Sequence, residues 1–441
     1  MGILFSVCAF LFTLLRTRQG VAKGLESLLA VGYAYGIVRA NFPDGRSHFA
    51  FDFALLGLYL AHFSQRPSAR GVAQGRPAVF WLKVLAVLPA LYFLVPVQHP
   101  LIQLVGLRAA VLFLPLIVIG ARLELEDLGR LARSLAVLNV AAVAFAFAEL
   151  LLGVEVFYPR NQVTELIYRS TDVGVDQAMR IPATFTSSHA FAGTLVGTLP
   201  ILLGSWSHLA KGRRERTLLF AAIGVTALGI FLSGARLPVI ILVVLVSIAF
   251  LSGRLLARRK IALAVGGVAV ALLISTTERF QRFLTLRDTA FVEERVASSV
   301  NLGFFEVVWD YPLGVGLGRA AGTSIPFFLA DLADPQIGME NEYSRLALEQ
   351  GIIGLAVWAV FILWTLTRSV SWAPPSWSLG ARMIQVTVAV IWVTSMIGTG
   401  TLTSIPGTSL LLLYMGLLSS GQAREAPEAA RPQRFLVASP R

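Results

Sequence analysis

Residues 340–364 read ENEYSRLALEQGIIGLAVWAVFILW, so that a polar segment runs directly into a long apolar helix. The apolar part is long enough to cross a bilayer, which takes about 20 mostly apolar residues. Charged side chains at the entrance of a membrane helix are costly to desolvate and usually mark a working site. A glycine-rich turn, YPLGVGLG at residues 311–318, lies shortly before this segment. The stretch therefore predicts a membrane helix with a functional site at its mouth.

The composition of the 441 residues extends this interpretation to the whole chain. Hydrophobic residues make up 56% of the chain, charged residues 14%, and the mean hydropathy is +0.72. Soluble domains usually contain about 25% charged residues. An aqueous globular fold could not hide this much apolar surface. The composition predicts an all-α polytopic membrane protein.

Twelve apolar runs are long enough to be candidate spans. They are Leu25–Arg39, Phe49–Phe63, Val79–Val97, Leu101–Ala121, Leu135–Gly153, His189–Ser207, Thr217–Leu232, Leu237–Leu251, Ile261–Thr276, Leu346–Thr367, Ile384–Ile397 and Leu402–Leu418. The apolar start, Ile3–Leu15, is either a thirteenth span or an interfacial segment. It lacks the small-residue cleavage site of a removed signal peptide.

Lysine and arginine gather in alternate loops, which predicts that those loops and the tail are cytoplasmic. The opposite, outward set includes two long loops, 154–188 and 277–345, and the second is net acidic and lies before the last three spans. Residues 1–421 are thus predicted to form a single transmembrane domain, with a disordered cytoplasmic tail at 422–441. The net charge of +12 is distributed over short loops that touch lipid head groups, which argues against nucleic acid as a partner.

Four arginines lie in or beside predicted spans near their outward ends: Arg39, Arg108, Arg236 and Arg345. Snorkelling to the interface would explain Arg39. Arg236 lies in a tight turn, LSGARLP at 232–238, that leaves no room for a long loop. A guanidinium group binds phosphate oxygens with two parallel hydrogen bonds and stays charged. Arg236, and less strongly Arg108, are therefore candidates for holding an anionic group.

The segment around residue 340 offers further candidates. Glu340 would enter a partly desolvated site, where a carboxylate can act as a general base, although acidic residues at a helix start also stabilise the helix dipole. Asn341, Tyr343 and Arg345 follow it, and Arg345 shares a helix face with Glu349. The glycines of the turn, among them Gly316 and Gly318, indicate a close backbone approach.

Arg295 and His189 complete the candidates. Arg295 precedes a partly amphipathic run in the large outward loop, and a solvated ion pair with a neighbouring glutamate would also explain it. His189 lies alone at a span entrance, where a histidine is usually an interface residue. The outward loops contain no metal-ligand motif, so no metal and no cofactor are expected. The single cysteine, Cys8, excludes an intramolecular disulfide.

Taken together, residues 180–365 resemble the O-antigen ligase/polymerase superfamily. The similarity lies in Arg180-Ile181-Pro182-Ala183-Thr184-Phe185, the Ser233-to-Arg236 turn, the glycine turn, and Glu340-Asn341-Glu342-Tyr343 leading into Gly351 and Gly354. Over residues 1–150 the chain resembles the superfamily only in its pattern of hydropathy.

The resemblance implies a multi-pass protein of the bacterial inner membrane whose active site faces the periplasm. It implies transfer of a glycan from undecaprenyl pyrophosphate to an acceptor glycan or glycolipid hydroxyl, without a nucleotide sugar or a metal. The pyrophosphate-binding arginines of that family carry over to Arg236 and Arg295. Ligases place a histidine where this chain has Glu340, which favours a polymerase or an unusual acceptor, with Glu340 as the base.

Two other classes fit the sequence. A transporter or flippase of lipid-linked glycans would suit twelve spans, although it should place polar groups near mid-span rather than at the outward ends. A non-catalytic partner in a polysaccharide assembly machine is the second alternative, because the family histidine is replaced.

Overall fold

The computed structural model describes residues 1–43, 45–159, 161, 164, 180–208, 212–251, 257–258, 260–261, 264–267, 289–297, 304–320, 325–332, 339, 341–368, 373, 377–398 and 400–420. Within these ranges the regular structure is helical, with no strand. The α-helices are α1 (Gly2–Arg18), α2 (Val21–Asn41), α3 (Ala50–Phe63), α4 (Ala69–Phe93), α5 (Pro100–Val111), α6 (Pro115–Ala121), α7 (Leu125–Leu152), α8 (Val154–Phe157), α10 (Ser188–His208), α11 (Arg213–Leu232), α12 (Arg236–Leu251), α14 (Thr289–Ala297), α15 (Glu306–Asp310), α16 (Glu342–Thr367), α17 (Ser378–Thr394) and α18 (Gly407–Ser419). Short 3-10 helices cover Ser47–Phe49 and Phe327–Leu332.

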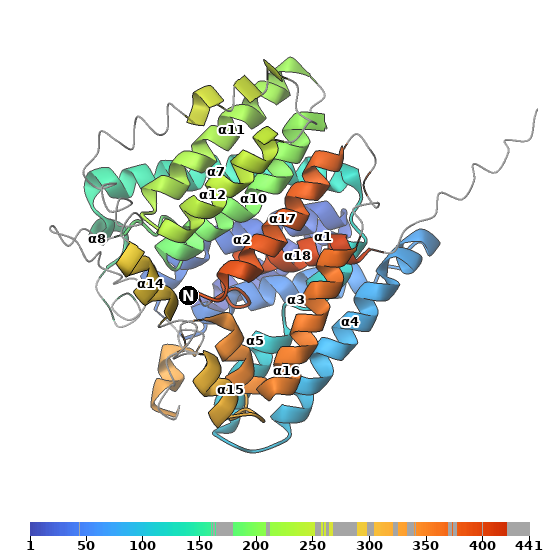
Figure 1. Cartoon of the computed structure of the whole chain (residues 1–441), viewed down its shortest axis with the longest axis vertical. Coiled ribbons are helices and arrows are strands. Elements are labelled where there is room, and N and C mark those ends of the chain that lie inside the picture. Colours follow the sequence, from blue (N-terminus) through green and yellow to red (C-terminus); the bar gives the residue numbers. More distant parts are fainter. Residues whose placement is uncertain are drawn as a thin grey trace, which may run out of the picture.

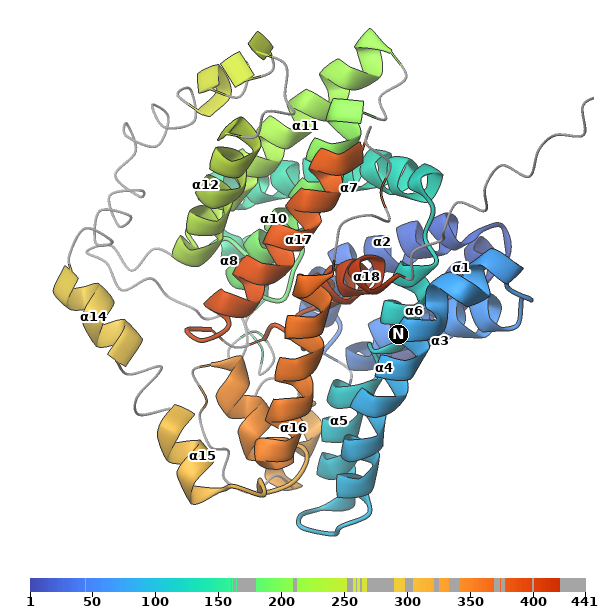
Figure 2. The same cartoon turned by 45° about the vertical axis from the view of Figure 1, so that its right-hand side comes forward.

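The helices form two groups with a pair between them (Figure 1). Helices α7, α10, α11 and α12 lie together on one side, and α4, α5, α15 and α16 lie on the other. Helices α17 and α18 lie between the groups in both views (Figure 2). Helix α1 packs along α3 and against α2.

Among the described residues, seven helical segments are long and apolar enough to cross a membrane. They are Val21–Asn41, Ala69–Phe93, Pro100–Ala121, Leu125–Leu152, Ser188–Ser207, Arg213–Leu232 and Glu342–Thr367, and α12, α17 and α18 are shorter apolar helices. These segments confirm an all-α, membrane-embedded protein. They do not confirm the count of twelve spans. The predicted span Ile261–Thr276 and the tail at 422–441 fall wholly or largely outside the described residues.

Several helices begin earlier than the hydropathy predicts. The starts of α4, α7 and α11 precede the apolar run and contain arginines within their first nine residues. Because arginine and lysine are good helix formers, a helix can continue through charged residues that lie outside its apolar stretch. These turns extend the helices beyond the apolar layer.

Contacts between helix ends show at which of the two ends of the bundle each loop lies. At the end with the basic loops, Arg133 pairs with Glu215 across the starts of α7 and α11. At the other end the Asn41 side chain donates to the carbonyl of Phe157, which joins the α2 terminus to the start of the first long loop. Helix α1 reaches both levels: Ser6 donates to the carbonyl of Arg46 at one end, and the α1–α2 turn lies at the other. Helix α1 therefore extends as far as its neighbours α2 and α3.

Helix α18 occupies the centre of the bundle. Every residue from Thr408 to Ser419 is buried. It crosses α6 at two glycines, because a Cβ on Gly120 would lie 2.2 Å from the carbonyl oxygen of Leu413, and one on Gly416 would lie 2.2 Å from that of Ile117. Small residues that let backbones approach are typical of helix packing in membranes, where the hydrophobic effect does not drive association.

A buried polar network ties four helices together at mid-height. Tyr33 of α2 donates to the Asn139 side-chain oxygen of α7 at 2.5 Å. The Asn139 amide donates to Thr198 of α10 and Thr226 of α11, each at 2.8 Å. Asn139 thus uses both ends of its side chain in a site with no water exposure. Such bonds add directional contacts to an otherwise apolar interface.

Replacing Asn139 with leucine should lower the free energy of unfolding by about 1–2 kcal/mol, because the Tyr33 hydroxyl and two threonines lose their partner. The measurement is reversible unfolding in mixed detergent micelles. Val140→Ala, on the exposed face of α7, is the matched control and should change stability by less than about 0.5 kcal/mol. Equal stability of Asn139→Leu and the control would show that the network contributes nothing.

Candidate functional site

The end of the bundle opposite the basic loops is built around residues 181–185, which lie between α2 and α7. The Ala183 amide donates to Glu149 of α7 at 2.9 Å, and the Ile37 amide of α2 donates to the Thr184 carbonyl at 3.1 Å. Gly36 is required here, because a Cβ would lie 2.0 Å from the Phe185 backbone. The segment is thereby fixed to two helices and positions the residues on both sides of it.

Arg180, His189 and Arg236 lie together at this end, and we call them the cationic cluster. Arg180 Nη1 is 3.4 Å from His189 Nε2, and Arg236 lies within electrostatic range of Arg180. Partial burial lowers the pKa of the Arg180 guanidinium below its ordinary value. His189 is in the first turn of α10 and Arg236 is the first residue of α12. Each of these two side chains therefore lies at a helix N-terminus, which adds partial positive charge beside it.

The turn before Arg236 is internally fixed. Ser233 is fully buried, donates to the carbonyl of Ile230 at 2.6 Å, and accepts from the Ala235 amide at 3.1 Å. Gly234 has a φ of +72°, which a residue with a side chain rarely adopts. The serine and glycine of the predicted motif thus form the turn that starts α12 at Arg236.

Arg108 is engaged by an acidic partner. Its Nε and Nη2 atoms donate to the two oxygens of Asp52 at 2.5 and 2.7 Å, and its guanidinium lies 5.8 Å from the ring centre of Phe49. This bidentate pair joins α5 to α3. Arg39 is also buried, at 6% exposure, rather than extended to the interface as snorkelling would require.

Arg345 is enclosed between two carboxylates of its own helix. It donates to Glu342 from Nε at 2.8 Å and to Glu349 from Nη1 at 3.0 Å. All three residues are buried. Glu342 also accepts from the amides of Gly400 and Thr401, at 2.9 and 3.1 Å. We call Glu342, Arg345 and Glu349 the charged triad.

The second carboxylate of the triad reaches the glycine turn. Glu349 accepts from the Gly318 amide at 3.1 Å. Gly318 has a φ of +86°, and a Cβ there would lie 2.5 Å from the carbonyl oxygen of Ile102. A Cβ on Gly316 would lie 2.1 Å from the Val97 side chain. Gly318 therefore allows the close backbone approach that the sequence predicts, and Gly316 leaves room for a side chain. Both neighbours belong to the protein.

The glycine turn also breaks α16. Gly351 has φ +66° and ψ −173° inside the helix. The Ile352 amide donates to the Pro312 carbonyl at 2.9 Å, and the Leu348 carbonyl accepts from the Val315 amide at 2.7 Å. The turn thus supplies the partners that the interrupted helix loses, as buried backbone groups require.

Asn341 and Tyr343 have structural partners as well. The Asn341 side chain accepts from the Ser344 amide at 2.6 Å and caps α16. The Tyr343 hydroxyl donates to the Trp392 carbonyl at 2.8 Å. Glu340 lies outside the described residues, and so does the side chain of Arg295. Nothing in the structure bears on the roles predicted for those two.

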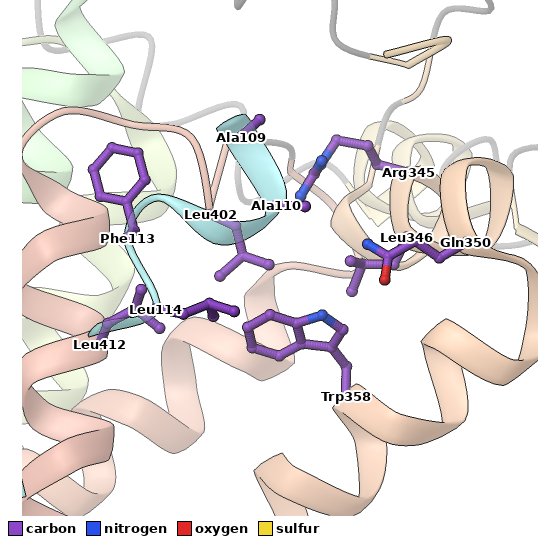
Figure 3. Close-up of a pocket in the computed structure, with 10 residues that line it drawn as sticks. All are labelled: Ala109, Ala110, Phe113, Leu114, Arg345, Leu346, Gln350, Trp358, Leu402 and Leu412. Carbon is purple, nitrogen blue, oxygen red and sulfur yellow. The ribbon is translucent and has the colours of Figure 1, made fainter. Parts of the chain in front are cut away.

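A small cavity lies beside Arg345 (Figure 3). Arg345, Leu346, Gln350 and Trp358 of α16 face it from one side, and Phe113 and Leu114 face it from the other. Its volume of about 10 Å³ holds about one water molecule. The cavity is too small for a sugar, so the surroundings of Arg345 are packed protein.

Sequence reasoning missed two carboxylates at this end. Asp52 is a single acid in the predicted span Phe49–Phe63, and Glu149 is another in Leu135–Gly153. An acid in an apolar run must find a partner, so Asp52 could have been matched with an arginine such as Arg108. The pairing of Arg345 with Glu349 follows from their four-residue spacing.

No protein-family model matches this chain, and no curated protein does. The resemblance to the O-antigen ligase/polymerase superfamily therefore stays a prediction from the motifs, and the function must be argued from the site.

Replacing Arg345 with alanine should destabilise the protein by about 3–5 kcal/mol, because two buried carboxylates lose their counter-charge. Detergent unfolding measures this loss. The neutral combination Glu342→Gln, Arg345→Met and Glu349→Gln should recover part of it. If Arg345→Ala unfolds like the wild type, the triad is not a structural element.

Gly351→Ala should cost more than about 2 kcal/mol, because the backbone conformation is nearly restricted to glycine and the new Cβ would lie 2.6 Å from the Leu313 carbonyl carbon. Gly224→Ala is the matched control, since open space surrounds that helical position. The control should leave stability unchanged or raise it slightly. Equal effects of the two substitutions would contradict the close contact.

Proposed function

We propose that this chain is a membrane glycosyltransferase that moves a glycan from undecaprenyl pyrophosphate to an acceptor hydroxyl at the outward end of the bundle. The observation that carries the proposal is the cationic cluster. Arg180 contacts His189 in the first turn of α10, and Arg236, the first residue of α12, lies within electrostatic range of Arg180. A diphosphate head group is the membrane ligand that best fits two neighbouring guanidinium groups.

We assign Arg108 and Arg345 to the framework. Arg108 pairs with Asp52 and joins α5 to α3, and Arg345 pairs with two carboxylates of its own helix, α16. The proposed binding group consists of Arg180, Arg236 and His189.

The cluster would assist the reaction through the charge that develops on the leaving group. In the transfer, the acceptor oxygen forms a bond to the anomeric carbon, and the bond from that carbon to the phosphate oxygen breaks. The pyrophosphate leaves with that electron pair, and guanidinium donors stabilise the growing negative charge. The acceptor proton must go to a base. From the sequence alone we assign that role to Glu340, one residue before the α16 cap, with Arg295 as a further phosphate ligand.

Substituting Arg236 with alanine should weaken binding of undecaprenyl pyrophosphate about 10- to 150-fold, the loss expected for charge-assisted hydrogen bonds of about 1.5–3 kcal/mol. The measurement is a binding titration of the full chain in phosphatidylcholine nanodiscs. Arg236→Lys should recover part of the affinity, because the charge remains and the bidentate geometry is lost.

Arg214→Ala is the matched control for this titration. Arg214 is exposed in the first turn of α11, at the opposite end of the bundle, and its loss should leave affinity within about twofold. If Arg236→Ala binds the lipid as the control does, the cationic cluster is not the pyrophosphate site.

A transfer assay separates the enzyme from the alternative classes. Purified chain with an undecaprenyl-pyrophosphate oligosaccharide should yield longer glycans, detected by mass spectrometry, and Arg236→Ala should reduce the yield. Movement of the lipid across the bilayer without a new glycosidic bond would instead identify a transporter. If neither a longer glycan nor movement of the lipid were detected, the result would favour an assembly partner.

A further inference from the structure

A hollow much larger than the cavity beside Arg345 lies at the opposite end of the bundle from the cationic cluster. It is lined by α1, α2 and α7 and has room for about 380 Å³, within the range of ligand sites. Helix α2 packs against both α1 and α7, so α2 forms the floor and the other two form the walls. Small residues on α2, Ser27 and Ala30, line the floor.

The lining changes from polar to apolar in the same direction on all three helices. On α1 the residues are Arg16 and, one turn deeper, Phe12. On α7 they are Arg133 and, one turn deeper, Val137, and on α2 Glu26 gives way to Ala30 in the same way. A spacing of four residues places each pair on one helix face. The groove therefore has a charged mouth toward the basic end and an apolar interior toward the middle of the bundle.

The mouth offers two guanidinium groups to an anion. Arg16, Arg133 and Glu26 line it, and Glu215 of α11 pairs with Arg133 beside it, so each arginine has one carboxylate partner. The Arg16–Glu26 pair is long, at 3.3 Å, and so is the Arg133–Glu215 pair, at 3.4 Å. The two arginine side chains are 37% and 54% exposed. Both guanidinium groups can therefore turn toward a phosphate at low cost, since exposed ion pairs contribute little.

We propose that this groove binds one anionic phospholipid, with its phosphate between Arg16 and Arg133 and an acyl chain along Phe12, Ala30 and Val137. The interior residues Phe12 and Val137 are exposed, as contacts for a lipid chain would be in the empty groove. Basic pockets between membrane helices on the cytoplasmic side are suited to acidic head groups. The site is independent of the proposed transfer reaction, because its residues lie at the other end of the bundle.

The test is native mass spectrometry of the full-length chain titrated with phosphatidylglycerol or phosphatidylcholine. The wild type should prefer phosphatidylglycerol. Arg16→Gln with Arg133→Gln should reduce that preference roughly thirtyfold, at roughly fivefold per arginine. Arg130→Gln, an exposed arginine on the same helix outside the groove, is the control and should keep the preference.

A second variant separates a lipid from a free phosphate ion. Ala30→Leu fills the apolar floor without changing charge, so it should weaken phosphatidylglycerol binding and leave competition by inorganic phosphate unchanged. An unchanged lipid preference in the double arginine variant overturns the proposal, as does equal binding of phosphatidylcholine by the wild type. Full displacement of the lipid by inorganic phosphate, with no effect of Ala30→Leu, would assign the site to a free anion and also overturn it.

Discussion

The placement of Arg345 between two buried carboxylates is the constraint on which the half of the bundle opposite the basic loops depends. The charged triad has one positive and two negative groups, so its excess negative charge must be offset by donors from elsewhere. Those donors are the amides of Gly318, Gly400 and Thr401, which belong to two different loops. The two carboxylates at the start of α16 thereby hold the glycine turn and the α17–α18 connection in place.

The polar residues at this end of the bundle differ in their surroundings. The Arg108–Asp52 pair joins α5 to α3, and the triad joins α16 to the loops whose amides it accepts from. In the cationic cluster Arg180 contacts His189, and Arg236 lies within electrostatic range of Arg180. We propose that these two guanidinium groups bind an anion.

The sequence predicts the helical membrane class and most helix positions, since apolar length is a direct physical requirement of the bilayer. It fails at helix ends, where α4 and α7 continue through arginines. The triad pairing of Arg345 with Glu349 is readable from spacing alone, whereas the Arg108–Asp52 pair joins residues far apart in sequence and requires the fold. The break at Gly351 was not predicted either, because it depends on hydrogen bonds supplied by residues 312–315. Local patterns determine local structure, and tertiary partners determine which charges are satisfied.

The complete burial of α18 has a consequence for how the chain is assembled. At 13 residues it is about 20 Å long, shorter than the hydrocarbon layer of about 30 Å. It meets protein on all sides, with α6 against its Gly416 and the Gly197 carbonyl of α10 accepting from its Tyr414 hydroxyl. Transfer of so short a helix into lipid alone gains little free energy. Its insertion must therefore be coupled to packing in the space that the preceding helices leave between them. Insertion of α18 against the helices already in place should therefore be the last step of membrane insertion. A substitution that distorts α6 should then prevent α18 from inserting.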